Sequence, residues 1–303
     1  RFRIKTKDQK AMDRRTFLQH SCKTAAALPF ASTATLLGGG AGELAREPAR
    51  HYIKRGDGKV QCLLCPWQCT VEPGKRGHCK TRKNIGGDYY SLVYGRISAA
   101  HVDPVEKKPF YHVMPGSSVF SLATAGCNFD CKFCQNWTLA RRLPDDIPNQ
   151  KFTPGDVVKT AEKMHAPLIA YTYNEPTIYQ EFIVDTTRIA KEAGLKTVMV
   201  SNGYINQKPL KELCGLIDAY KVDLKSFSQD YYSNVVNGRL QPVLDTLVML
   251  KEHHVWTEIV YLTVPTLNDN AREVKDMAQW IIRELGADVP LHFSRFMPRY
   301  KLK

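Results

Sequence analysis

No part of this sequence is apolar for long enough to suggest a membrane-spanning helix. A span needs about 18 or more consecutive apolar residues, and no stretch of the chain provides them. A basic excess is also scarce beyond the N-terminal region. Of the net charge of +13, residues 1–60 contribute +8 (13 Lys and Arg against 5 Asp and Glu) and residues 61–303 only +5 (30 against 25). The main part of the chain therefore gives little support for nucleic-acid binding.

The composition also excludes a disordered or collagen-like chain. Hydrophobic residues make up 43% and charged residues 24%, which is typical of a globular protein, and 303 residues suffice for one large domain or two ordinary ones. Cysteine is the unusual residue. Of the nine cysteines, seven fall within residues 62–79 and 127–134, so these two segments are the first candidates for a functional site.

The N-terminal residues are typical of an export signal. Arg14-Arg15-Thr16-Phe17-Leu18-Gln19 is a twin-arginine pattern, an Ala-rich apolar run follows from Ala25 to Leu37, and small residues occupy 38–42. The alternative is the solvated start of a basic helix. We predict that residues 1–50 form a tail with a twin-arginine-type signal. At the other end a strand-like run closes the sequence, and we expect the natural chain to continue past Lys303.

From about residue 117, short β-rich runs alternate with helical patterns. The predicted strands are Ser117–Ala125, Leu168–Tyr173, Lys196–Val200, Ala219–Leu224, Trp256–Thr263 and Leu291–Phe296. Repeated strand–helix units predict an α/β fold with a parallel sheet. The pattern alone does not distinguish six units of a barrel from a doubly wound sheet. In both folds the chemistry lies at the carboxyl ends of the strands.

Local signals mark the ends of several helices. Thr153 and Pro154 are a typical N-cap and first-turn residue, and Gly194 is a typical residue just past a helix end. Asn270 and Glu273 have the spacing of a capping box for the last helix.

Three cysteines follow the first predicted strand. Cys127, Cys131 and Cys134 have the spacing C-x3-C-x2-C, which is poor for disulfides. A closed zinc site would need a fourth ligand, and no Cys or His occurs in the next 20 residues. Three thiolates can instead hold three irons of a 4Fe-4S cluster and leave the fourth iron open, as a catalytic site requires.

This motif resembles the signature of the radical S-adenosylmethionine (SAM) superfamily. A finer resemblance is to the AmmeMemoRadiSam-system radical SAM enzymes, which are similar to pyruvate formate-lyase-activating enzymes. It covers about residues 60–300 and is carried by the segments 103–112, 126–137, 173–177, 222–225 and 290–296. The resemblance implies a partial (β/α)6 TIM-like radical SAM barrel over residues 101–303. It also implies a cluster that cleaves SAM reductively to a 5′-deoxyadenosyl radical, which abstracts a hydrogen atom.

Polar residues near the ends of other strands are the candidates for binding SAM. By the resemblance, Glu175 receives the SAM ammonium, against the alternative of an ordinary loop residue. Ser201 and Asn202 can donate to the SAM carboxylate or ribose, or simply form an Asn-Gly turn. Asp223 and Lys225 share one face of a strand, where a buried pair needs each other or a ligand.

His292 shares a strand face with Ser294. From the residues alone it is an ordinary core histidine. The resemblance favours a place at the SAM site or the substrate.

Four further cysteines form a separate motif, Cys62, Cys65, Cys69 and Cys79, with the spacing C-x2-C-x3-C-x9-C. Tight turns around four thiols are typical of a metal-binding module, here over residues 51–100. Zinc and a second iron–sulfur cluster both remain open, and two disulfides are the alternative.

We therefore predict a radical SAM enzyme with an unidentified substrate, which in a narrower version is a glycyl residue of a partner protein. The alternatives are a non-catalytic iron–sulfur electron carrier and a Cys-rich nucleic-acid-binding module. The predicted partners are SAM, a low-potential electron donor and the substrate. If the enzyme is an activase, that substrate is a protein. The location stays open, because the signal indicates export whereas SAM and reductant are cytoplasmic supplies.

Overall fold

The computed structural model describes residues 42–302. The predicted twin-arginine signal lies outside this range, apart from its last small residue, Gly42. Within the range, no helix has the length and hydrophobicity needed to cross a membrane. The last residues of the predicted tail include a short strand, β1 (Glu47–Pro48), which pairs with β6 (Asp88–Ser91).

Six parallel strands form the main sheet, in the order β15-β14-β13-β12-β11-β9, and the antiparallel strand β8 (Ala99–Pro104) extends it beside β9. The parallel strands are β9 (Ser118–Ala123), β11 (Leu168–Tyr171), β12 (Lys196–Ser201), β13 (Ala219–Asp223), β14 (Trp256–Thr263) and β15 (Leu291–Arg295). All six predicted strands are confirmed, with ends that differ by at most two residues.

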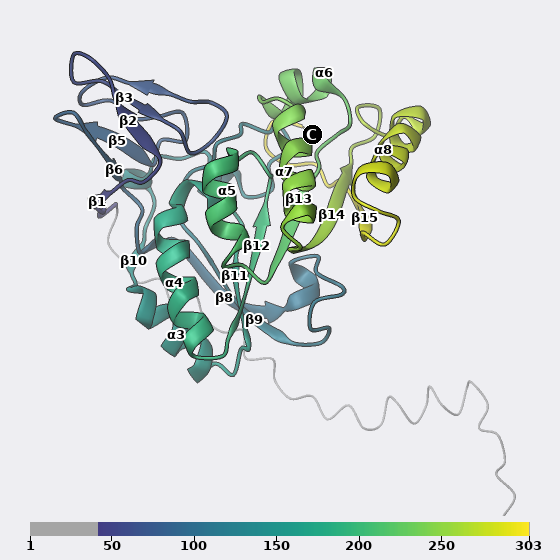
Figure 1. Ribbon diagram of the computed structural model, residues 1–303, viewed down its shortest axis with the longest axis horizontal. Coiled ribbons are helices and arrows are strands. Elements are labelled where there is room, and N and C mark those ends of the chain that lie inside the picture. Colours follow the sequence, from purple (N-terminus) through teal and green to yellow (C-terminus); the bar gives the residue numbers. More distant parts are fainter. Residues whose placement is uncertain (1–41, 303) are drawn as a thin grey trace, which may run out of the picture. The chain divides into compact units, whose positions relative to one another are not determined.

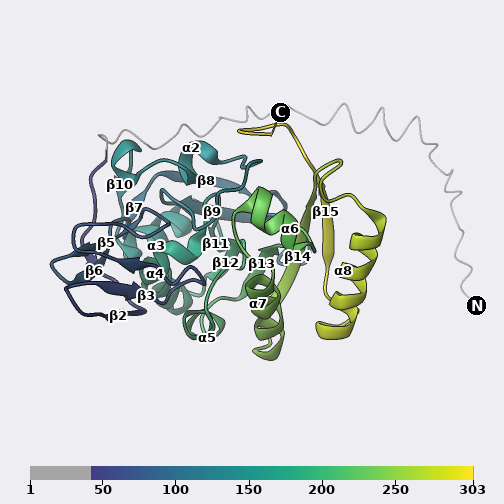
Figure 2. The same ribbon diagram turned by 90° about the horizontal axis from the view of Figure 1, so that it is seen from above.

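The connecting helices lie along one face of this sheet (Figures 1 and 2). They are α3 (Pro154–Lys163), α4 (Gln180–Glu192), α5 (Gln207–Cys214), α7 (Gln241–Glu252) and α8 (Ala271–Glu284). A doubly wound sheet carries helices on both faces. The arrangement therefore agrees with the predicted partial barrel, open between β8 and β15.

Shorter helical segments complete this part of the chain. They are η1 (Val105–Lys107), α2 (Trp137–Ala140), η2 (Pro144–Asp146), η3 (Pro176–Tyr179), α6 (Gln229–Tyr231) and the π-helical η4 (Tyr232–Val236).

The helix ends follow the predicted signals except in one case. Thr153 caps α3, and Gly194 adopts a left-handed φ of 73° after α4. Asn270 caps α8 by accepting from the backbone N–H groups of Arg272 and Glu273. The predicted capping box is wrong, because Glu273 Oε1 instead accepts from the Phe227 N–H at 2.7 Å and from Ser226 Oγ at 2.5 Å. These loop donors, 46 and 47 residues away in sequence, replace the local partner.

Side chains alternate between two apolar cores on the faces of the sheet. Tyr220 and Val222 of β13 point outward and pack in the large core that includes the helices. Ala219 points inward and belongs to a smaller core with Phe110, from the loop after β8. Both faces of the strands are therefore buried, as is typical of parallel sheets.

Residues 47–97 form small antiparallel sheets beside the main one (Figure 1). One contains β1, β6 and β5 (Arg82–Ile85). A second contains β2 (Tyr52–Lys54), β3 (Val60–Cys62) and β4 (Thr70–Val71), and β7 (Arg96–Ile97) pairs with β10 (Gln150–Lys151).

A buried ion pair fastens these small sheets to the helical layer. Arg82 Nη2 of β5 lies 2.5 Å from Glu181 Oε2 of α4, and their side chains are only 1% and 3% exposed. The second carboxylate oxygen of Glu181 accepts the Arg50 N–H at 2.7 Å. Arg82 also donates from Nε to the Ile178 carbonyl oxygen at 3.3 Å. Because the charges are mutually satisfied, their burial is tolerated only while both partners are present.

We predict that Glu181→Ala lowers the free energy of unfolding by about 3–5 kcal/mol, because it leaves the Arg82 guanidinium buried without a counter-charge. The matched control is Asp88→Ala, which removes the partner of Lys54 in an exposed ion pair and should change stability little. Urea unfolding of both variants checks this. Equal losses in the two variants would contradict it.

Candidate functional site

A cavity of about 460 Å³ opens where the parallel strands end. Its wall contains all three cysteines of the C-x3-C-x2-C motif and five of the six residues predicted to bind SAM: Cys127, Cys131, Cys134, Glu175, Ser201, Asn202, Asp223 and Lys225. Segments up to about 100 residues apart in sequence thus meet at one place. This convergence follows from the parallel sheet, whose carboxyl ends share one edge.

The residues between the three cysteines anchor their loop in the protein core. Phe129 is buried against Tyr204, with ring centroids 4.7 Å apart. The amide group of the buried Asn128 donates to the Tyr204 carbonyl oxygen at 2.8 Å and accepts from Asn202 Nδ2 at 2.8 Å. The Asp130 N–H donates to the carbonyl oxygen of Val236 in η4 at 3.0 Å. Asn128 and Phe129 thus fix the loop to the core, and the cysteines line the cavity.

The three thiols suit a multi-iron cluster better than a single metal ion. Among the residues that the structure describes, these sulfur atoms do not all lie within 4.8 Å of one another. A single tetrahedral zinc, with Zn–S bonds of about 2.3 Å, would hold them about 3.8 Å apart. Burial raises the pKa of all three thiols, that of Cys131 to about 12, whereas the Lys225 ammonium acts to lower it. A bound metal would supply positive charge that favours the thiolate form of these groups.

Glu175 presents a buried carboxylate to the same cavity. Its Oε1 accepts from Ser201 Oγ at 2.7 Å and from the Thr177 N–H at 3.0 Å, and its Oε2 accepts from the Asn202 N–H at 2.8 Å. These donors are all neutral, and no Lys or Arg of residues 42–302 forms an ion pair with it. Burial raises the pKa of Glu175. The site thus holds an acidic group suited to a cationic ligand.

Asp223 lies between two lysines. Its Oδ2 is 2.8 Å from Lys225 Nζ, and its Oδ1 contacts Lys221 Nζ. Burial alone would raise the pKa of Asp223, but the two ammonium groups hold it well below its usual range. The trio carries one negative and two positive charges, and the surplus positive charge can pair with an anionic group of a ligand. Sequence reasoning identified Asp223 and Lys225 but missed Lys221, although the same two-residue periodicity places it on that face.

A second polar cluster at the cavity was also missed. Lys108 is buried, and its Nζ donates to Asp103 Oδ2 at 2.9 Å and to Tyr173 Oη at 3.0 Å. Both Lys108 and Tyr173 line the cavity. The segment 103–112 contributed to the family resemblance, but no periodicity placed its side chains at the site.

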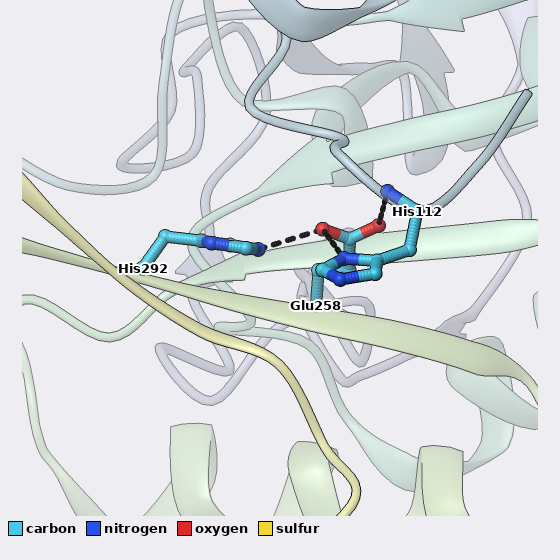
Figure 3. Close-up of side chains that lie close together, drawn as sticks. All are labelled: His112, Glu258 and His292. Carbon is cyan, nitrogen blue, oxygen red and sulfur yellow. Dashed lines mark hydrogen bonds and ion pairs between the residues drawn. The ribbon is translucent and has the colours of Figure 1, made fainter. Parts of the chain in front are cut away.

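His292 is not part of this cavity. Its Nε2 lies 2.7 Å from Glu258 Oε2, beside His112 (Figure 3). It does share a strand face with Ser294, as predicted, but it lies two residues earlier in β15, and Ser294 is the one that lines the cavity. The position of His292 in the sheet therefore gives no support to a role in binding SAM.

The other four cysteines lie together in the small antiparallel region. Cys62 and Cys65 are buried, and Cys69 and Cys79 are partly buried. Burial, and after it the neighbouring thiols of Cys62, Cys79 and Cys69, raise the pKa of Cys65 well above its usual value. All eight cysteines within residues 42–302 are free thiols, so the alternative of two disulfides is not observed.

This four-cysteine segment packs directly against the three-cysteine loop. Trp67 Nε1 donates to the Asn128 carbonyl oxygen at 2.7 Å. Gly126, with a left-handed φ of 91°, lies so close that a Cβ atom would come within 2.8 Å of the Cys79 carbonyl oxygen and 2.4 Å of Thr81 Cγ2. Only glycine allows this approach, so the two cysteine motifs are mechanically joined.

Comparisons with known proteins identify the family of this chain and several relatives. A family described as the Radical SAM superfamily matches residues 121–281. An uncharacterised protein of Methanocaldococcus jannaschii is 44% identical over 84% of this chain and 75% of its own. The pyruvate formate-lyase-activating enzyme of Clostridium pasteurianum is 22% identical over 52% of this chain and 66% of its own. Among solved structures, SuiB of Streptococcus suis with its precursor peptide gives a TM-score of 0.49 at 13% identity, over 61% of this chain and 41% of that one.

Proposed function

The chain belongs to the radical SAM superfamily and is an enzyme, and from this premise we propose that the cavity binds a 4Fe-4S cluster together with SAM. One observation carries the proposal: the same cavity of about 460 Å³ is lined by three cysteines and by a buried carboxylate that pairs with no Lys or Arg of residues 42–302. When bound, such a cluster supplies the electron that cleaves SAM to methionine and a 5′-deoxyadenosyl radical, which abstracts hydrogen from the substrate.

The residues of the cavity divide the work of binding. Cys127, Cys131 and Cys134 hold three irons and leave the fourth free for SAM. Glu175 accepts a hydrogen bond from the SAM ammonium. The ammonium supplies a positive charge, which the neutral donors around Glu175 do not. Lys221 and Lys225, with one positive charge in excess of Asp223, bind the SAM carboxylate.

An activase-like reaction is the narrower proposal. Its support is the similarity to pyruvate formate-lyase-activating enzymes, which extends over about half of this chain. The substrate would then be a glycyl residue of a partner protein, and a low-potential donor would supply the electron. A non-catalytic electron carrier has no need for an open cavity with ligand-binding groups beside its cluster, so the cavity disfavours that alternative.

We expect Cys127→Ala, Cys131→Ala and Cys134→Ala each to abolish the formation of 5′-deoxyadenosine from SAM by anaerobically reconstituted, reduced protein. Each change removes one of three cluster ligands, and no Cys or His occurs in the 20 residues that follow them. Cys214→Ala, in α5 and away from the cavity, is the matched control and should retain activity. Wild-type product yields from all three variants would refute the cluster assignment.

For Glu175→Gln we predict a 10- to 100-fold weaker affinity for SAM with an unchanged iron content. The carboxylate makes a charge-assisted bond of about 1.5–3 kcal/mol to the ammonium, and about 1.4 kcal/mol corresponds to a factor of ten. Titration of SAM into the reduced, reconstituted protein measures the effect.

Two further variants separate charge from architecture. Ser201→Ala removes one hydrogen bond to Glu175 but keeps the charge, so its affinity loss should be smaller. Glu192→Gln, on the exposed end of α4, should behave as the wild type. Unchanged affinity in Glu175→Gln would defeat the assignment, and loss of iron would show instead that Glu175 holds the strand ends together.

We also propose that Cys62, Cys65, Cys69 and Cys79 bind a second metal, zinc or an iron–sulfur cluster, that does not react with SAM. The support is their spacing and their state as free thiols, of which Cys62 and Cys65 are buried and Cys69 and Cys79 partly buried. No three of these sulfur atoms lie within 4.8 Å of one another, which favours the cluster over zinc by the criterion applied to the other motif. The triple variant Cys127→Ala, Cys131→Ala, Cys134→Ala should therefore still contain zinc or iron by elemental analysis. Metal-free protein with two disulfides by mass spectrometry would reject this second site.

A further inference from the structure

Three metal-binding side chains meet on the inner face of the sheet, outside the cavity described above (Figure 3). His112 comes from the loop after η1, Glu258 from β14 and His292 from β15. Within residues 42–302, this is the only group of three His, Cys, Asp or Glu residues whose ligand atoms all lie within 4.8 Å of one another.

The ligand atoms of this group lie close enough together to surround one small cation after a shift of roughly 1 Å or less. Glu258 Oε2 lies 2.7 Å from His292 Nε2 and 3.3 Å from His112 Nδ1. Tetrahedral zinc with Zn–N and Zn–O bonds of about 2.0–2.1 Å holds its ligands about 3.3 Å apart. Two imidazoles and one carboxylate are also a known zinc ligand set, which leaves the fourth position to water.

The carboxylate of Glu258 is fixed in place but lacks a permanent cation. It is fully buried, and Oε1 accepts from the His112 N–H at 3.1 Å and from Trp256 Nε1 at 3.3 Å. The Tyr111 N–H donates to Oε2 at 3.1 Å. No Lys or Arg in the described part of the chain pairs with it, unlike Glu181 and Asp223. Such outer hydrogen bonds typically orient a metal-bound carboxylate.

Solvent can reach the group from one side. The His112 side chain is 51% exposed and that of His292 is 19% exposed, whereas Glu258 is closed off. An ion therefore has an entry path from solvent.

We propose that His112, Glu258 and His292 bind a zinc ion that links the loop after β8 to strands β14 and β15. Because β8 and β15 are the two ends of the open main sheet, the ion ties opposite ends of the partial barrel together. This site uses none of the residues assigned to the cluster or to SAM, and it stands or falls independently of the proposed function.

The test is titration of Zn²⁺ and Co²⁺ into the purified full chain and its His112→Ala variant. The wild type should bind one more equivalent of Zn²⁺ than the variant. The difference between the Co²⁺ spectra of the wild type and the variant should show the visible absorption of a nitrogen–oxygen site and no sulfur-to-cobalt charge-transfer band, because both proteins keep the same free cysteines. Loss of an outer partner typically weakens metal binding 10- to 100-fold, so loss of a direct ligand should weaken it at least as much. His253→Ala, an exposed histidine after α7, is the matched control.

Zinc should also raise the unfolding temperature of the wild type more than that of His112→Ala, because binding to the folded state stabilises it. The same differences are expected for Glu258→Gln. If the buried change Glu258→Gln prevents folding, the His112→Ala variant still tests the proposal, because His112 is half-exposed. Equal zinc equivalents and equal cobalt spectra in the wild type and His112→Ala would overturn the proposal and leave a hydrogen-bonded His–Glu–His cluster only.

Discussion

Six neighbouring strands run in the same direction, and the positions of the cavity residues at their carboxyl ends depend on this constraint. Because side chains alternate along each strand, every second residue faces inward, and the inward residues nearest the carboxyl ends converge. Ala219 lies in the inner apolar core, and two and four residues later Lys221 and Asp223 line the cavity. The same step leads from Glu258 to Val260 in β14. A shift of one residue in any strand would exchange these side chains with the helical core.

Buried carboxylates are the second theme of this structure, and each is balanced differently. Glu181 has a permanent partner in Arg82, which makes it part of the scaffold. Asp223 has two partners and leaves positive charge over. Glu175 and Glu258 accept hydrogen bonds from neighbouring donors, but neither forms an ion pair with a Lys or Arg of residues 42–302. An unpaired buried charge costs free energy. A cationic ligand or metal ion therefore stabilises the protein most at these two carboxylates.

The strands and the cysteine loop of this fold could be predicted from the sequence, because each is marked by a pattern of neighbouring residues. The strands from Trp256 to Thr263 and from Leu291 to Arg295 are visible as β-rich runs, and the three cysteines follow the first strand within eleven residues. Periodicity also placed Asp223 and Lys225 on one face. Such signals depend only on neighbouring residues and on the geometry of a strand.

Long-range contacts were beyond that reasoning. Glu273 was expected to complete a helix cap, but a loop 46 residues away in sequence supplies its donors. His292 was assigned by resemblance, whereas its position is set by Glu258, 34 residues earlier, and by His112 from a loop near the other end of the sheet. Lys108 meets Tyr173 across 65 residues. The two members of each pair are farther apart in sequence than any helix or strand pattern extends, so only the fold reveals these contacts.

The attachment of the four-cysteine segment has a consequence for synthesis of the chain. Arg239 donates to the Pro66 carbonyl oxygen at 2.9 Å, across 173 residues, and Asn206 donates to the Leu63 carbonyl oxygen across 143. At translation rates of about 5–20 residues per second, the ribosome needs roughly 9–35 s to add the later partner. In the later part of that interval the four thiols have left the ribosome, but the surface that covers them does not yet exist. Metal loading of this segment, or its oxidation, therefore competes with elongation of the same polypeptide.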